Sequence, residues 1–352
     1  MSRSSAAAAF LTTVLLLLGS TSCGASWAAP LPLKRVRDIP AGAPTRRFDY
    51  ASLDAQRRLL FVADLAGSRV LAFDVQAGRL VKAVPGVAAV HGVLAVPELG
   101  LVYASATAAD TLVAIDERTF AIAARSPAGH HPDGVAWDPK DRKLYVSDET
   151  GGAVAVIDAA SRRLVKLIPM GGDVGNTQYD AGSGLVFSNA EGRDELVAID
   201  PRTDRIVARD PLPGCAGNHG LLIDAQRRLA FVACENNARL VTLSLATQSQ
   251  ITADSVGAGP DVLAYDSELG RLYVSSESGV ASVFQIKDGK KAKLGQAWLG
   301  DNAHTVAVDP ATHLVYFPLR NVGGRAVLRV MAPRTPMPGS RPRRTAPPAR
   351  GA

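Results

Sequence analysis

The chain is built from seven copies of one repeating unit. One series of positions is separated by steps of 42, 42, 42, 44, 42 and 43: Asp49, His91, Asp133, Gly175, His219, Asp261 and His304. A second series keeps the same register and is wholly aromatic: Phe61, Tyr103, Tyr145, Phe187, Phe231, Tyr273 and Tyr316. Two series in one register indicate a true repeat. A period of about 42 residues is typical of a β-propeller with one blade per copy.

The third copy shows most clearly what one unit contains. Its four short runs, 133–138, 143–147, 153–158 and 163–168, are rich in β-branched and aromatic residues and are bounded by Gly, Pro, Asp or Ser. This pattern predicts four antiparallel strands joined by tight turns. No part of the mature chain shows a long helical period. We therefore expect an all-β fold, a seven-bladed propeller of four-stranded antiparallel blades.

The seventh copy is incomplete, and the N-terminal segment offers the missing strand. The last copy stops after its third strand, near residues 327–330, whereas 33–40 (LKRVRDIP) resembles the fourth strand of the third copy at 163–169 (RLVKLIP). The N-terminal strand is expected to complete the last blade, which closes the ring and removes open sheet edges. Residues 31–332 then form one domain, with blades starting near 49, 91, 133, 175, 219, 261 and 304.

A recurring aspartate follows the first strand of almost every copy. It occupies six of the seven equivalent positions, with Val96 as the exception: Asp54, Asp138, Asp180, Asp224, Asp266 and Asp309. Aspartate favours turns because its side chain accepts hydrogen bonds from nearby backbone N–H groups. These carboxylates are therefore predicted to be turn residues rather than catalytic ones.

The N-terminal segment 1–28 has the features of an export signal. Arg3 precedes an apolar core over 6–18 that is too short to span a bilayer, and small residues follow it, so cleavage after Ala28 is expected. Lipid attachment at Cys23 is the less favoured outcome, because Ser20 occupies the place of the aliphatic residue in a bacterial lipoprotein signal. Both outcomes place the protein in the periplasm or outside the cell, with no transmembrane helix in the mature chain.

The net charge of +6 comes from the two ends of the chain. Residues 333–352 contain five arginines and no acid, and Arg3 lies in the signal; without these six, basic and acidic residues both number 33. A neutral propeller without a basic stripe makes nucleic acid an unlikely partner. The Pro- and Arg-rich tail is expected to be disordered, and the protein is expected to be a monomer.

Two cysteines remain in the mature chain, and both lie in the fifth copy. Cys215 precedes the first strand and Cys234 ends the second, so a tight hairpin places them side by side. In an exported protein such a pair predicts a disulfide. The alternative is a metal cluster of Cys215, Cys234 and His219, which an oxidising compartment disfavours.

The opening series is the candidate functional site. Each member starts the first strand of a blade, and in propellers that strand lines the central channel, so the seven positions form a ring around one mouth. Three of the six histidines of the chain lie there, two, two and three blades apart. Converging imidazoles with an open fourth position suit a catalytic-type zinc or copper site, whose ligands would be His91, His219 and His304. The candidate ligand-binding residues Asp49, Asp133 and Asp261 would then orient the imidazoles.

Two other interpretations of the ring stay open. Neighbouring His and Asp side chains can hold a polar or cationic ligand without any metal, as converging polar groups in a concavity often do. Alternatively, the repeated His-Gly and Asp-Gly pairs satisfy exposed backbone at the start of each first strand and have only a structural role. The sequence alone does not choose between a metal site, a metal-free ligand site and a structural ring.

Several strands resemble the repeats of a known family. Leu144-Tyr-Val-Ser-Asp148, Leu272-Tyr-Val-Ser-Ser276 and Leu60-Phe-Val-Ala-Asp64, with 154–158 (VAVID), resemble the YVTN-repeat β-propeller family. The resemblance implies an exported seven-bladed propeller that binds a small molecule or a protein and carries no universal catalytic motif. The alternative is a metal-dependent lyase or hydrolase, since the histidine ring is similar in concept to the zinc site of peptidylamidoglycolate lyase, another propeller.

Overall fold

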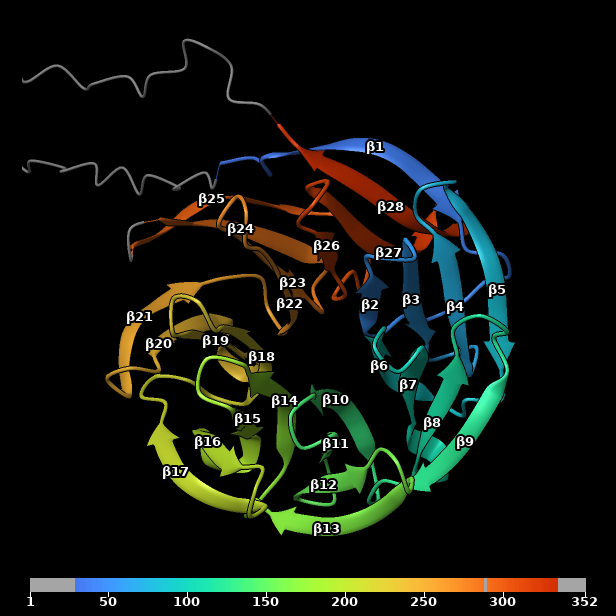
Figure 1. The fold of residues 1–352 in the computed structure, drawn as a ribbon. Helices are drawn as coiled ribbons and strands as arrows, with labels where there is room; N and C mark the ends of the chain where they lie inside the picture. Colours follow the sequence, from blue (N-terminus) through green and yellow to red (C-terminus); the bar gives the residue numbers. More distant parts are fainter. Residues whose placement is uncertain (1–28, 288–289, 335–352) are drawn as a thin grey trace, which may run out of the picture.

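The strands form seven sheets arranged as a ring around a central axis (Figure 1). The computed structural model describes residues 29–287 and 290–334. Each sheet has four antiparallel strands, and consecutive blades follow one another around the ring. The predicted all-β seven-bladed propeller is confirmed.

The blades have nearly equal strands. Blade one contains β2 (Ala51–Asp54), β3 (Leu59–Asp64), β4 (Arg69–Asp74) and β5 (Arg79–Pro85), and blade two contains β6 (Val90–Val96), β7 (Leu101–Ala106), β8 (Thr111–Asp116) and β9 (Ile122–Pro127). Blade three contains β10 (Pro132–Asp138), β11 (Lys143–Asp148), β12 (Ala153–Asp158) and β13 (Arg163–Pro169), and blade four contains β14 (Val174–Asp180), β15 (Leu185–Ala190), β16 (Glu195–Asp200) and β17 (Arg205–Pro211). Blade five contains β18 (Asn218–Asp224), β19 (Leu229–Cys234), β20 (Arg239–Ser244) and β21 (Ser249–Ser255), and blade six contains β22 (Pro260–Asp266), β23 (Arg271–Ser276), β24 (Val280–Lys287) and β25 (Lys290–Trp298).

The seventh blade joins the two ends of the described chain. It contains β26 (Ala307–Asp309), β27 (Leu314–Val322), β28 (Arg325–Pro333) and, as its outermost strand, β1 (Leu33–Pro40). β1 pairs antiparallel with β28, from Leu33 opposite Pro333 to Pro40 opposite Val327. The predicted closure of the ring by the N-terminal strand is confirmed, and Figure 1 shows β1 lying along β28.

The burial of each strand follows its distance from the axis. The second strands carry the aromatic series, and all seven of its members are buried. Inner strands such as β11 are buried on both faces, whereas the outermost strands, such as β13, alternate between exposed and partly buried residues. This difference arises because neighbouring blades cover both faces of an inner strand, and the outermost strand faces solvent on one side.

The recurring aspartates hold the turns after the first strands. Asp54 Oδ1 accepts hydrogen bonds from the backbone N–H groups of Gln56 and Arg57 at 2.8 and 3.0 Å, and Asp309 Oδ1 accepts one from Ala311 at 3.1 Å. The turn role that the sequence predicts for these carboxylates is confirmed.

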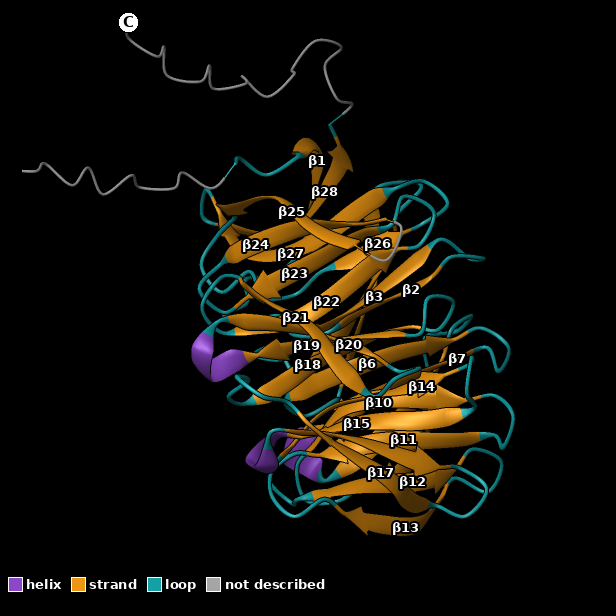
Figure 2. Cartoon of the chain, turned by 90° about the vertical axis from the view of Figure 1, so that its left-hand side faces the viewer, coloured by secondary structure: helices purple, strands orange, loops and turns teal. Residues whose placement is uncertain are grey.

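Helical structure in the described residues is limited to three short 3-10 segments. η1 (Thr107–Ala109), η2 (Glu191–Arg193) and η3 (Glu235–Asn237) connect the second and third strands of blades two, four and five. They lie on the same side of the disc (Figure 2). No helix within 29–287 or 290–334 is long and apolar enough to cross a membrane.

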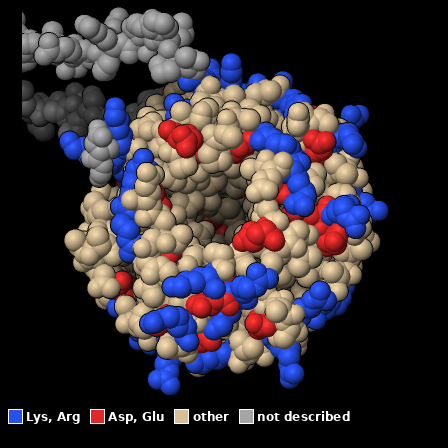
Figure 3. Space-filling model, in the orientation of Figure 1, with Lys and Arg blue, Asp and Glu red and all other residues tan. Residues whose placement is uncertain are grey.

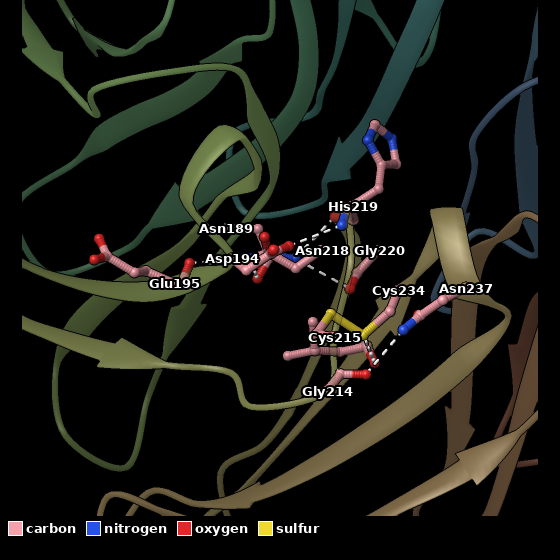
Figure 4. The surroundings of a disulfide bond; sticks show 12 residues. Asn189, Asp194, Glu195, Gly214, Cys215, Asn218, His219, Gly220, Cys234 and Asn237 are labelled. Carbon is pink, nitrogen blue, oxygen red and sulfur yellow. Dashed lines mark hydrogen bonds between the residues drawn. A yellow bond between two sulfur atoms is a disulfide. The ribbon is translucent and has the colours of Figure 1, made fainter.

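Cys215 and Cys234 form a disulfide, as the sequence predicts. Their Cα atoms are 5.3 Å apart, and the bond ties the loop before β18 to the end of β19. Figure 4 shows the imidazole of His219 pointing away from this bond. The alternative of a metal cluster of these three residues is therefore wrong, because both sulfurs are consumed by the disulfide.

Two predictions concern residues outside the described part of the chain. The export signal over 1–28 and residues 335–352 of the basic tail both lie there.

Ring closure by β1 predicts a large effect for one apolar residue of that strand. Ile39 is buried against the core of the seventh and first blades, whereas Val36 on the same strand is exposed. Ile39→Ala is expected to lower the free energy of unfolding by about 2–4 kcal/mol, and Val36→Ala by less than about 0.5 kcal/mol. Urea denaturation of both variants checks this. Equal effects would show that β1 does not hold the ring closed.

Candidate functional site

Five ring positions lie at an irregularity in the first strand of their blade. In β10, for example, Pro132 pairs with Asp148, but the next pair joins Val135 and Val146, so the register shifts at the ring residue. The same shift occurs in β6, β14, β18 and β22. A β-bulge turns a side chain away from the regular alternation of the strand. The bulges therefore set the direction of the ring side chains at one mouth of the channel.

The glycines that follow several ring residues allow the first strands to come close together. A Cβ atom on Gly92 would lie 2.1 Å from the carbonyl oxygen of Asp133, and one on Gly220 would lie 1.8 Å from that of Asp261. The Tyr50 N–H also donates a hydrogen bond to the His91 carbonyl in the next blade at 3.4 Å. The close approach of the strands thus explains the glycine of each His-Gly and Asp-Gly pair. The His and Asp side chains need a separate explanation.

His304 is a buried cation. Its Nδ1 lies 2.8 Å from Asp261 Oδ2 and 2.7 Å from Glu277 Oε1, and its Nε2 donates to the Phe48 carbonyl at 2.7 Å. Burial alone would lower the pKa of His304, but the two carboxylates hold it well above its usual value. Both ring nitrogens face acceptors, so the protonated imidazole is an internal counter-ion and offers no lone pair to a metal.

The other two ring histidines have different environments. His219 Nδ1 lies 3.0 Å from Glu191 Oε2, and its Nε2 lies 3.7 Å from Asp133 Oδ2 and 3.6 Å from Asp261 Oδ1. Burial opposes its charge, but these carboxylates raise its pKa well above the usual value. Burial lowers the pKa of His91, whose Nδ1 lies 2.9 Å from the Ala89 carbonyl. His219 is thus protonated at neutral pH, and His91 is neutral.

The three ring aspartates are buried and incompletely paired. One carboxylate oxygen of each has no hydrogen-bond partner: Asp49 Oδ2, Asp133 Oδ1 and Asp261 Oδ1. Burial raises the pKa of Asp49 to about 6 and that of Asp133 well above its usual value. Burial alone would raise the pKa of Asp261, but the hydrogen bond from His304 and the charges of His219 and His304 lower it below its usual value. Buried polar atoms are nearly always paired, so three such oxygens in one ring mark a place for a ligand.

A second ring of acids surrounds the first, and the sequence analysis missed it. Four glutamates directly follow the second strands of blades three to six: Glu149, Glu191, Glu235 and Glu277. Their spacing along the chain is the same as that of the ring positions from Asp133 to Asp261, which is the signal that could have found them. Arg47, two positions before Asp49, joins them with a 2.7 Å ion pair to Glu277.

A tyrosine closes the channel below the ring. Tyr50 follows Asp49 in blade one, and its hydroxyl donates a 2.5 Å hydrogen bond to Asn176 Oδ1 in blade four, almost opposite across the axis. The deeper channel holds a cavity of about 150 Å³ whose polar lining includes Ser52, Thr177 and Gln178. The opposite mouth of the channel is hollowed at the centre of the disc, with basic and acidic residues interspersed around it (Figure 3). The Tyr50–Asn176 hydrogen bond thus spans the channel between the ring and this cavity.

The structure places the three ring histidines in separate groups. Two clusters among the described residues could hold an ion, one of Asp49, Asp261 and His304 and the other of Glu191, His219 and Glu235. Each contains one ring histidine, and His91 belongs to neither. The predicted three-histidine metal site stays a prediction, but the arrangement favours carboxylates rather than imidazoles as ligands.

Comparison with known proteins supports the fold but identifies no family and no specific function. No family model and no curated protein sequence matches the chain. Among solved structures, a chain of Kuenenia stuttgartiensis hydrazine synthase is similar, with a TM-score of 0.69 and 13% sequence identity over 83% of this chain and 96% of that one. An identity this low supports the propeller fold alone, so membership of the YVTN-repeat family stays a prediction.

The burial of Asp133 predicts a variant that is more stable than the natural protein. Its folded-state pKa lies above the unfolded value of about 3.9, so its stabilising contribution is present only at low pH and is lost as the pH rises through the folded-state pKa. Asp133→Asn is expected to raise Tm at pH 7 by about 3 °C, equivalent to about 1 kcal/mol. The gain should shrink toward pH 4, as thermal denaturation across this range will show.

Asp110→Asn is the matched control. Asp110 is exposed, and its left-handed backbone (φ 55°) also suits asparagine. No change in Tm is expected for this variant. A lower Tm for Asp133→Asn at pH 7 would contradict the view that the ring aspartate costs stability.

Proposed function

We propose that the protein is an exported binding protein that takes a small cationic ligand at the acidic channel mouth. The observation that carries this proposal is the set of three buried aspartate oxygens without a hydrogen-bond partner. Natural proteins retain groups that cost stability where function requires them. The propeller supplies the rigid scaffold on which such a site keeps its geometry.

The charge of the mouth determines the sign of the ligand. Among the described residues, Arg47 and the protonated His219 and His304 lie against carboxylates of the two rings, and His131 Nδ1 lies 3.0 Å from Glu149 Oε2. These groups are fewer than the seven acids of the rings, of which Asp49 and Asp133 have raised pKa values. The remaining negative charge lies in a concave, partly desolvated site, where electrostatic attraction is stronger than in bulk water. A cation is therefore favoured over an anion or a neutral sugar. Access is from the solvent side of the mouth, because the Tyr50–Asn176 hydrogen bond spans the channel on the other side.

The exported location rests on the sequence and on one covalent feature. Cys215 and Cys234 form a disulfide. A disulfide persists in an oxidising compartment. The disulfide therefore agrees with the export signal expected over 1–28 and supports a periplasmic or secreted protein. The YVTN-repeat resemblance likewise implies an exported seven-bladed propeller.

A metal-dependent lyase or hydrolase is the alternative function. The cluster of Asp49, Asp261 and His304 favours it, since these side chains bring possible ligand atoms within reach of one ion. Against it, both nitrogens of His304 already face acceptors. Metal analysis of the mature protein by mass spectrometry tests this alternative. One equivalent of zinc or copper, lost in a His91/His219/His304 triple-alanine variant, would favour the metal enzyme.

The binding proposal predicts that cations stabilise the protein through Asp133. A ligand that binds only the folded state raises Tm as its concentration increases. At constant ionic strength, at least one member of a panel of inorganic and organic cations is expected to raise the Tm of the natural protein, whereas anions and neutral sugars should not. Asp133→Asn is expected to weaken this binding at least tenfold, or about 1.4 kcal/mol, because the amide cannot ionise to become the charged acceptor that a bound cation favours.

The two readouts of this variant separate a binding defect from misfolding. Asp133→Asn should be the more stable protein and yet the weaker binder, while Asp110→Asn should match the natural protein in both. If no cation changes Tm at any concentration, the mouth is a structural ring and the proposal fails.

A further inference from the structure

The hairpin of β24 and β25 in blade six is longer than its counterparts in the preceding blades. The third strands of blades one to five each have six residues, whereas β24 has eight. The two added pairs join Ile286 to Lys291 and Lys287 to Lys290. In repeat proteins, insertions in single copies often lie on a binding face. The extension is a departure from the repeat that the propeller scaffold does not itself require.

The added residues form one wall of a cavity between blades five and six, which are adjacent in the ring (Figure 1). The cavity has a volume of about 320 Å³, within the range of small-molecule sites. Leu229, Phe231 and Ile251 of blade five and Ile286 of the extension make it largely apolar. A wider cavity of about 890 Å³ shares Leu229, Ile251 and Ile286 with it, so the two spaces adjoin.

The charged residues of the smaller cavity are all basic. Among the described residues, Lys290 and Lys291 line it and no acid does. The Lys291 side chain is only 4% exposed, and its ammonium lies 2.8 Å from Asp254 Oδ2 and donates to the Thr242 hydroxyl. A lysine ammonium has three N–H donors, so one has no acceptor within the described part of the chain. Burial lowers the pKa of Lys291, and an anion in the cavity would favour its charged form.

The distribution of charge between the two cavities sets the direction of an anionic ligand. Glu268 lines the wider cavity beside Arg227 and Lys287, so an anion is less favoured there. The negative group of a ligand therefore lies at Lys290 and Lys291 in the smaller cavity. The rest of the ligand meets the apolar lining and points toward the wider cavity.

We propose that the smaller cavity binds an aliphatic carboxylate of medium chain length between blades five and six. The carboxylate accepts hydrogen bonds from Lys290 and Lys291. The chain lies along Leu229, Ile251 and Ile286, and the removal of this apolar surface from water stabilises the complex. The site is separate from the acidic channel mouth and takes a ligand of the opposite charge.

The test compares ligands that differ either in charge or in chain length. Isothermal titration calorimetry at pH 7.5 is performed on the full mature chain with octanoate, butanoate and 1-octanol. Octanoate is expected to bind at least tenfold more tightly than butanoate, which keeps the charge but buries less apolar surface. It should also bind at least tenfold more tightly than 1-octanol, which has the chain without the charge.

A substitution in the apolar wall locates the bound chain. Ile251→Glu should weaken octanoate binding at least tenfold, because it places a negative charge beside the chain. Ile251 is 48% exposed, so the fold tolerates the change. Val207→Glu is the matched control, since Val207 is the third residue of β17, as Ile251 is of β21, and is 55% exposed. This control should bind octanoate like the natural chain.

A double substitution tests the recognition of the carboxylate. The variant with Lys290→Gln and Lys291→Gln should bind octanoate at least tenfold more weakly and should no longer prefer it to 1-octanol. Thermal denaturation shows whether this variant is folded, and Ile251→Glu tests the site independently of the buried lysine. Lys82→Gln, at an exposed lysine of β5 in blade one, should leave octanoate binding unchanged.

Three results would overturn the inference. They are the absence of octanoate binding, equal binding of 1-octanol to the natural chain, and octanoate binding that neither Ile251→Glu nor the folded double variant weakens. These results do not bear on the acidic channel mouth, whose test uses cations and Asp133→Asn.

Discussion

The close approach of seven first strands around one axis is the constraint on which the rest of this structure depends. Neighbouring strands come so near that a Cβ on Gly92 or Gly220 would collide with the backbone of the next blade. Glycine is therefore required at these positions, and a register shift accompanies it in the strand. The residues before the glycines are turned toward the channel mouth and are largely buried there, whatever their charge.

Burial of charge is the main cost of this arrangement, and the ring offsets part of it internally. Buried carboxylates are costly unless they are paired, and His304 lies between Asp261 and Glu277 as their counter-ion. His219 has the same role toward Glu191 and, at longer distance, Asp133. The pairing is incomplete, because one oxygen of each ring aspartate has no hydrogen-bond partner. A site that is only partly neutralised is suited to a cationic ligand that completes it.

The histidines show how the same residue type serves different purposes in equivalent positions. His304 and His219 are held in the protonated form by carboxylates, whereas His91 faces a backbone carbonyl and is neutral. Converging positions in the sequence repeat suggested three equivalent imidazoles. The structure separates them because their contacts differ. His304 and His219 meet carboxylates of the preceding blade, Asp261 and Glu191 respectively, whereas His91 contacts Ala89 and Thr107 of its own blade.

The sequence by itself determined the number of blades, their strand order, the closure by β1, the disulfide and the identity of the ring positions. These features follow from the sevenfold repeat and from local turn and strand patterns, which depend on residues near one another in the chain. Only the tertiary structure decided that Tyr50 reaches Asn176 across the axis and that His304 pairs with Glu277. Such contacts join residues from different blades, and they depend on bulges and side-chain directions that a periodic pattern does not encode.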